Sequence, residues 1–160
     1  MSAPSLAALY DFETQLETAV ASILTAGGVT VAGKARADVT LTTPCCEVTS
    51  SISGPYPASA PDFYSVSGDY RPCTFSGTVQ VHILTDRKRN ASSHGTFRGG
   101  VRALLYAFVS KFTSSNLPYL EVFDAQESGS FNSVDDERGL DLTTLSWEVR
   151  FAILPTAWPT

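Results

Sequence analysis

The 160-residue sequence predicts a single α+β domain, with one mainly antiparallel β-sheet and two α-helices packed on one face of it. Three observations lead to this prediction. Two segments repeat apolar residues at helical spacing. Several short runs alternate apolar and polar residues, as strands with one buried face do. The length suits one domain, 1–160, whose core is large enough to need no disulfide or metal.

Both helices are predicted from apolar periodicity. The first spans residues 4–26 and ends at Gly27, a common terminating residue. Its apolar positions are Leu9, Phe12, Leu16, Val20 and Ile23. The second spans residues 97–112, with apolar positions Phe97, Val101, Leu104, Leu105, Phe108 and Phe112. Gly99 and Gly100 interrupt it at about 1 kcal/mol each relative to Ala, so we expect either a start after Gly100 or close packing against the two glycines.

The predicted strands alternate apolar and polar residues. Cys45 and Cys46 are adjacent in the first of them and should point to opposite faces of the sheet. The polar residues 128–141 are expected to form a turn region between the last two strands. Residues 38–52, with Pro44 in the middle, are expected to form either two short strands or one strand over residues 45–52. Further strands are expected at residues 78–84, 119–127 and 145–153.

A long segment, residues 53–77, is rich in Pro, Gly, Ser and aromatic residues. Structureless loops of this length are unusual in compact domains, and disordered segments avoid aromatic residues. We expect an inserted, extended arm that becomes ordered against a partner. Its candidate contact residues are Tyr56, Phe63, Tyr64 and Tyr70.

The charge content is low, at 17% against about 25% in a typical soluble domain. The deficit is deepest in residues 39–77, where only four side chains are charged: Glu47, Asp62, Asp69 and Arg71. Subunit interfaces are depleted of charged side chains at their centre. We therefore expect this part of the chain to be covered by another subunit.

The bulk numbers argue against several classes of protein. A net charge of −5 argues against a dedicated nucleic-acid-binding protein. The N-terminal segment lacks the basic start of a secretory signal, and no apolar run reaches the roughly 20 residues of a membrane span. We expect a soluble chain, made in a cytoplasm, with reduced cysteines and no membrane contact. Three Cys and two His at no ligand spacing predict no metal site and no cofactor.

The densest charge cluster contains Asp135, Asp136, Glu137 and Arg138. Three consecutive acids offer oxygen ligands to a divalent cation, but their spacing does not match an EF-hand loop. We favour a solvated hairpin turn that forms salt bridges with Arg138 or with a neighbouring chain.

A short basic run contains Arg87, Lys88 and Arg89. Such a run is usually a solvated loop. If several copies form a ring, the same run repeats around it and faces either a DNA channel or acids of the next subunit.

The two histidines are interpreted as non-catalytic. His82 lies on the polar face of a strand, and His94 is expected in a loop beside Gly95. Catalysis would require a nucleophile or carboxylate within hydrogen-bonding reach, and no nucleophile motif such as GxSxG is present. We expect no catalytic residues and no enzyme activity.

One motif carries a family resemblance. Residues 133–140, followed by the alternating strand that ends at Ile153, resemble the end of tail-terminator proteins of long-tailed, lambda-like bacteriophages. Those proteins end in an acidic "DD, then Gly-Leu" turn and a last amphipathic strand. The order of helices and strands is also similar over most of the chain, whereas the arm at residues 53–77 is an addition.

The resemblance implies a structural virion protein without chemistry of its own. It implies a homohexameric ring that caps the tail tube, stops its growth and presents a surface to the head connector and neck proteins. Assembly is implied in the host cytoplasm, at the head–tail junction, with DNA passing through the ring lumen. By position, residues 135–138 are expected to contact a neighbouring subunit or the tail tube protein, and residues 87–89 an interface or the lumen.

Three alternatives stay open at the level of sequence. The chain is also consistent with a neck or stopper protein on the head side of the joint. A second alternative is a small metal-dependent cytoplasmic enzyme that uses the acids at residues 135–137. A third is a monomeric adaptor whose aromatic arm binds a peptide.

Overall fold

The structure is a computed structural model that describes residues 11–33, 42–55, 65–66, 69–70, 74–88, 93–106 and 120–153. Two helices and six strands lie in these ranges. In chain order they are α2 (Phe12–Ala26), β1 (Cys45–Pro55), β2 (Ser65–Val66), β3 (Asp69–Tyr70), β4 (Thr74–Asp86), α3 (His94–Leu105), β5 (Leu120–Asp135) and β6 (Leu140–Ile153).

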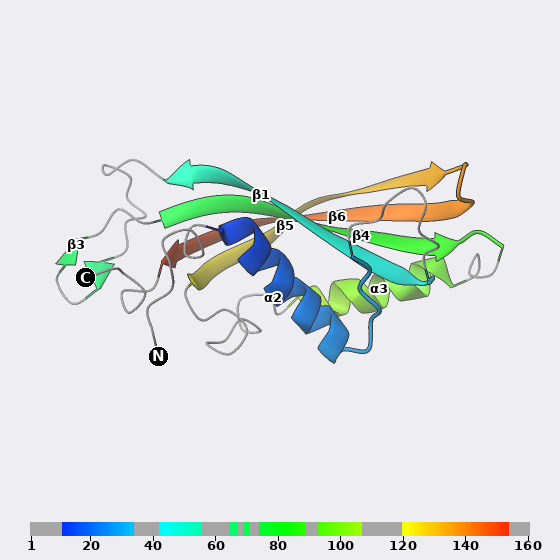
Figure 1. The fold of residues 1–160 in the computed structure, drawn as a ribbon, viewed down its shortest axis with the longest axis horizontal. Coiled ribbons are helices and arrows are strands. Elements are labelled where there is room, and N and C mark those ends of the chain that lie inside the picture. The colour runs from blue at the N-terminus through cyan, green and yellow to red at the C-terminus, as the bar shows by residue number, and fades with distance from the viewer. Residues whose placement is uncertain are drawn as a thin grey trace.

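The main sheet has four antiparallel strands in the order β1-β4-β6-β5. Helices α2 and α3 both lie below the sheet in Figure 1, so the two described helices cover the same face of it. The remaining strands, β2 and β3, form a separate two-stranded pair. This arrangement confirms the predicted α+β class with both helices on one face.

Helix α2 confirms the first predicted helix from Phe12 to Ala26, while residues 4–10 of that prediction lie outside the described part of the chain. The carboxylate of the N-cap residue, Asp11, accepts a hydrogen bond from the N–H of Thr14 at 3.3 Å. At the other end, the N–H of Gly27 donates to the carbonyls of Ile23 and Leu24. The apolar stripe is buried: Phe12, Leu16, Ala19, Val20, Ile23 and Leu24.

Helix α3 differs from the prediction at its start. It begins at His94 and includes Gly99 and Gly100, so the expected start after Gly100 is wrong. The expected close packing is also wrong, because a Cβ atom on either glycine would meet nothing within 4 Å. Burial of Val101 and Leu105 holds the helix against the sheet despite the weak intrinsic propensity. Residues 107–112 of the predicted helix lie outside the described ranges.

Replacing both helix glycines with Ala is expected to stabilise the protein by about 0.5–1 kcal/mol per site. Ala restricts the unfolded chain more than Gly does, and neither site has a neighbour to clash with. The free energy of unfolding, measured in urea, tests this prediction. The control is Gly139→Ala, which should destabilise because Gly139 has a φ of +65°. A Gly99→Ala/Gly100→Ala variant less stable than the wild type would contradict the prediction.

The strands are longer than predicted. Strand β5 continues to Asp135 and β6 begins at Leu140, so residues 128–141 are not a turn region and only residues 136–139 connect the two strands. Residues 128–135 of β5 are exposed or half-buried on both faces of the sheet. Their sequence therefore does not alternate between apolar and polar residues. Backbone pairing with β6, rather than side-chain burial, keeps them in a strand.

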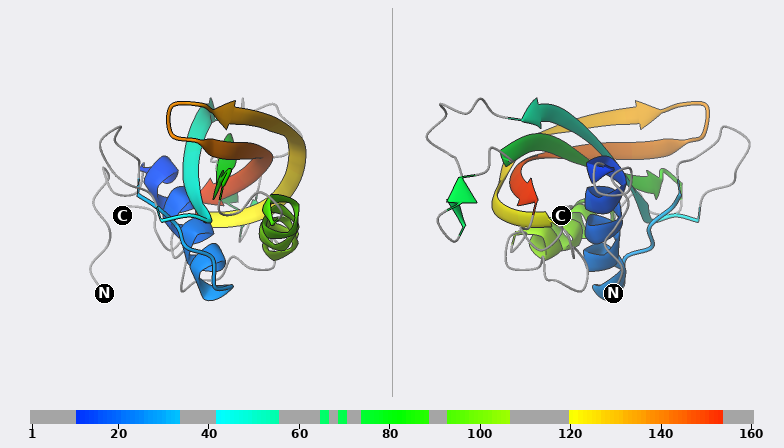
Figure 2. Two further views of the ribbon diagram at one scale, coloured as in Figure 1. Left: turned by 90° about the vertical axis from the view of Figure 1, so that its right-hand side faces the viewer. Right: turned by 60° about the vertical axis from the view of Figure 1, so that its left-hand side comes forward.

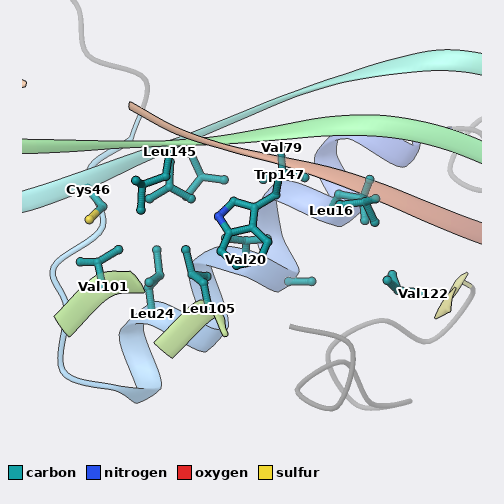
Figure 3. Packing of buried hydrophobic residues seen from close by; sticks show 14 of the residues in the cluster. Leu16, Val20, Leu24, Cys46, Val79, Val101, Leu105, Val122, Leu145 and Trp147 are labelled. Carbon is teal, nitrogen blue, oxygen red and sulfur yellow. The ribbon is translucent and has the colours of Figure 1, made fainter. Parts of the chain in front are cut away.

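The main core lies between the sheet and the two helices. Leu16, Val20 and Leu24 of α2, together with Val101 and Leu105 of α3, point toward Leu145 and Trp147 of the sheet (Figure 3). At one end, the ring of Phe12 lies 4.6 Å from that of Phe75 and 5.3 Å from that of Phe151, measured between ring centroids. Each of these rings comes from a different element, so the cluster joins α2, β4 and β6.

The two adjacent cysteines lie on opposite faces of the sheet, as predicted. Cys46 belongs to the main core, whereas Cys45 packs with Leu84 and Leu140 in a second cluster. Burial raises the pKa of both thiols, that of Cys46 to about 12. Both are therefore protonated, unreactive core residues at neutral pH.

The β1 edge of the sheet is covered by other parts of the chain. The N–H of Cys46 donates to the carbonyl of Thr30 at 2.9 Å, and the N–H of Ala32 donates to the carbonyl of Cys46 at 2.8 Å. Farther along the strand, a carboxylate oxygen of Glu17 accepts from the N–H of Ser50 at 3.0 Å and from its hydroxyl at 3.2 Å. Cys46 and Ser50 of β1 thus have hydrogen-bond partners outside the sheet.

Candidate functional site

The structure brings the acidic and basic clusters of the sequence together at one end of the sheet. The Arg87 guanidinium lies 3.2 Å from a carboxylate oxygen of Asp136 and 3.4 Å from one of Asp141. The N–H of Arg87 also donates to the carbonyl of Gly139 at 3.0 Å. Residues 136–139, which we call the hairpin tip, are therefore tied to the end of β4.

The acidic side chains around the hairpin tip differ in their partners. The Asp135 carboxylate accepts from the N–H of Arg138 at 3.1 Å and from its Nε at 2.7 Å. These hydrogen bonds hold the pKa of Asp135 below its usual value. Asp136 keeps 80% of its side chain exposed beside Arg87, and Glu137 is exposed. Asp135 thus closes the turn, whereas Asp136 and Glu137 face solvent.

The other candidate contact residues are placed only in part. The N–H of Lys88 donates to the carboxylate of Asp86 at 2.8 Å, while Arg89 lies outside the described residues. The ends of the predicted arm belong to strands β1 and β4, and its interior is described only at β2 and β3. Tyr56, Phe63 and Tyr64 fall outside the described residues, and Tyr70 is placed by its backbone, opposite Ser65.

The three consecutive acids do not converge on one point. Asp135 turns toward Arg138, and Asp136 turns toward Arg87. Among the residues that the structure describes, no three His, Cys, Asp or Glu side chains form a group able to hold a metal ion.

His82 lies on the sheet face opposite α2 and α3, in agreement with its predicted place on the polar face of its strand. Its Nδ1 is 2.9 Å from the hydroxyl of Thr144, and its Nε2 is 3.1 Å from the hydroxyl of Thr49. Burial lowers its pKa, partly opposed by Glu47. The imidazole thereby bridges β1, β4 and β6, which is a structural role.

His94 is not in a loop, as expected, but is the first residue of α3. Its Nδ1 lies 2.6 Å from the hydroxyl of Thr85 and its Nε2 lies 2.8 Å from that of Thr143. The Thr143 hydroxyl donates to Oδ1 of Asn132 at 2.7 Å, so it has only acceptor capacity left for His94. His94 therefore donates from Nε2. Burial lowers its pKa and so favours the neutral imidazole, whose Nδ1 accepts from the Thr85 hydroxyl.

The His94 network joins α3 to three strands of the sheet. Thr85 and Thr143 are fully buried, in register with the apolar positions of β4 and β6. In the sequence, the only signal for this network is that Thr85 and Thr143 occupy alternate positions that are otherwise apolar. The contact of His94 with them could not be predicted, because β4 and β6 lie far apart along the chain.

Mild acid is expected to destabilise the protein through His94 and His82. Burial lowers the pKa of His94, Asp141 opposes this shift and Arg98 adds to it. In the unfolded chain a histidine has a pKa of about 6.5. The unfolded state therefore binds protons more readily, and the free energy of unfolding falls as the pH drops below that value.

Urea unfolding between pH 7 and pH 5 measures this dependence. His94→Gln should flatten the pH profile, and His94→Gln combined with His82→Gln should flatten it further. A double variant with the full wild-type slope would contradict the assignment to these histidines.

A scan against protein-family models finds no match, and a search of curated proteins finds no significant one. Neither described helix has the length and hydropathy needed to cross a membrane.

Proposed function

We propose that the chain is a structural subunit of a bacteriophage virion that forms a ring, hexameric by resemblance, at the head–tail junction. It ends the tail tube and joins it to the head connector. The β5–β6 hairpin is the observation that supports the proposal most strongly. The acidic turn on which the family resemblance rests lies at the end of the two longest strands of the sheet, with Asp136 and Glu137 exposed (Figure 2).

A rigid hairpin tip suits a contact between proteins. The Asp135–Arg138 pair, the Arg87–Asp136 pair and Gly139 hold the turn in one conformation. Binding by a preorganised segment loses little conformational entropy. The exposed carboxylates then supply charge that orients the partner.

A closed ring also requires two different surfaces on each subunit, because its contacts run head to tail. The hairpin tip is one such surface. The sheet face opposite α2 and α3 is another. Its centre is mostly polar, with Thr49, Gln80, His82, Thr144 and Ser146, and Glu47 lies opposite His82. The hairpin tip and this face are different surfaces, as head-to-tail assembly demands.

Light scattering of the protein, alone and with tail-tube protein, tests the proposal. A particle of about six subunits, or tubes that stop growing when the protein is added, is the expected result. Binding to the head connector without arrest of tube growth would place the ring on the head side, as a neck protein. A monomer that affects neither partner would refute the proposal.

The hairpin tip is tested separately by Glu137→Ala. Asp135 and Asp136 are left in place because Asp135 closes the turn and Asp136 pairs with Arg87. This variant should retain the wild-type circular dichroism spectrum and lose tube arrest. The matched control is Glu13→Ala, which removes an exposed acid from α2. Equal loss of arrest in the control would show that net charge matters rather than the hairpin tip.

A further inference from the structure

Strand β5 forms the second edge of the sheet, opposite β1. Its last register shift lies between Glu127 and Gly129, after which it pairs regularly with β6 as far as Asp135. The other edge is covered at Cys46 and Ser50, as described above. In the described part of the sheet, the strand edge that remains for backbone pairing is therefore β5.

The register determines which backbone groups of β5 point away from the sheet. In an antiparallel ladder, alternate residues direct both their N–H and C=O to the same side. Cys46 directs both groups outward, to Thr30 and Ala32. Cys46 lies opposite Ile83, Ile83 opposite Thr143, and Thr143 opposite Asn132. Asn132 therefore directs its backbone groups outward as Cys46 does, and its neighbour Phe131 directs them toward β6. The outward-facing groups of β5 are then those of Ser130, Asn132 and Val134.

From Gly129 to Val134 this edge lacks the usual features that prevent pairing between sheets. Proteins commonly protect an edge with Lys, Pro, an inward-pointing charge or a bulge. Residues 129–134 contain no charge and no Pro, and the register shift lies before them, at Ser128. Two apolar side chains are exposed on it: Phe131 at 68% and Val134 at 55%.

We propose that residues 129–133 of β5 pair antiparallel with the same residues of a second copy, about a two-fold axis at Phe131. The two outward-facing residues Ser130 and Asn132 then lie opposite each other across the axis and exchange backbone hydrogen bonds. The two Phe131 residues form a non-hydrogen-bonded pair, in which Cα atoms approach to about 4.5 Å and aromatic side chains make contact.

Charge permits this pairing of identical strands. The antiparallel register places Glu127 of one copy near Asp135 of the other. Each carboxylate already has a partner in its own chain: Arg102 lies 3.0 Å from Glu127, and Arg138 lies 2.7 Å from Asp135. The flanks are therefore locally neutral, and the uncharged run between them is centred on Phe131.

The two-fold contact is separate from the proposed ring, whose contacts are head to tail. Two short strands bury less area than a standard stable interface. We therefore expect a weak dimer of the free protein whose population rises with concentration.

Sedimentation velocity over a range of concentrations tests the pairing. Ser130→Pro removes an N–H that points away from β6, so it should abolish the dimer and keep the fold. Phe131→Lys places two ammonium groups opposite each other and should also abolish the dimer. The control is Gln126→Lys, an exposed position of β5 before the register shift, which should dimerise like the wild type. Thermal unfolding of each variant confirms that its fold is intact.

A cysteine cross-link tests the register. Phe131→Cys should form an interchain disulfide on mild oxidation, whereas Ser133→Cys should not, because its counterpart lies away from the axis. The unmodified chain reports the background from its own cysteines. A wild type that stays monomeric, or folded Ser130→Pro and Phe131→Lys variants that still dimerise, would overturn the pairing. A wild type that forms the six-subunit particle but no two-fold dimer at any concentration would overturn the pairing while leaving the ring intact.

Discussion

Replacing Phe151 with Ala is expected to lower the free energy of unfolding by about 3–5 kcal/mol, the usual effect of removing a buried aromatic ring. Phe151 is fully buried on β6, an interior strand of the sheet. Its ring stacks on Phe75 at 5.6 Å and meets the edge of Phe12 at 5.3 Å. The variant leaves a cavity where β4, β6 and α2 meet, so both the sheet and the helix lose packing.

Urea unfolding followed by circular dichroism measures this effect. Phe131→Ala is a matched control, because it removes the same side chain from an exposed position of the neighbouring strand. The control should change stability by less than about 0.5 kcal/mol at low protein concentration. A Phe151→Ala variant within 1 kcal/mol of the wild type, on the same order as an ordinary substitution, would contradict the described core.

Replacing Thr143 with Val is expected to cost about 1–3 kcal/mol, although the two side chains have nearly the same shape. The Thr143 hydroxyl accepts from Nε2 of His94 and donates to Asn132. Val removes both hydrogen bonds at a fully buried position. The histidine N–H and the amide oxygen then lose a partner inside the protein.

The coupling between these residues is measured with a double-mutant cycle. Thr143→Val and His94→Gln should be non-additive, because each removes the same hydrogen bond. Thr96→Val, at an exposed position of α3, is the control for the loss of a hydroxyl and should be close to neutral. Additive effects of Thr143→Val and His94→Gln would contradict the network.

Local pattern was sufficient where one face of an element is buried. The alternation of Leu145, Trp147, Val149 and Phe151 predicts β6, and the same alternation places Cys45 and Cys46 on opposite faces. Burial on one face imposes a period on the sequence, and that period can be recognised without a structure. The prediction failed for residues 128–135, which are polar on both faces and are held by pairing with β6.

The candidate site was predictable in composition but not in geometry. Residues 135–138 and 87–89 are recognisable as charged clusters, but the contact of Arg87 with Asp136 depends on a register between strands far apart in the chain. The same holds for His94, whose partners lie on β4 and β6. Side-chain type is a local property, whereas hydrogen-bond partnership depends on which distant strands become neighbours.

The sequence by itself determined the α+β class, the buried face of α2 and of the central strands, and the charged residues of the hairpin tip. Each follows from local spacing, because burial favours apolar side chains at the period of the helix or strand. Only the tertiary structure decided that Cys46 and Ser50 of β1 have partners outside the sheet, that β5 is the opposite edge in the described part of the chain, and that Asp135 closes its own turn while Asp136 and Glu137 face solvent. These properties arise from strand order and register, which bring distant residues together and leave no periodic trace in the chain.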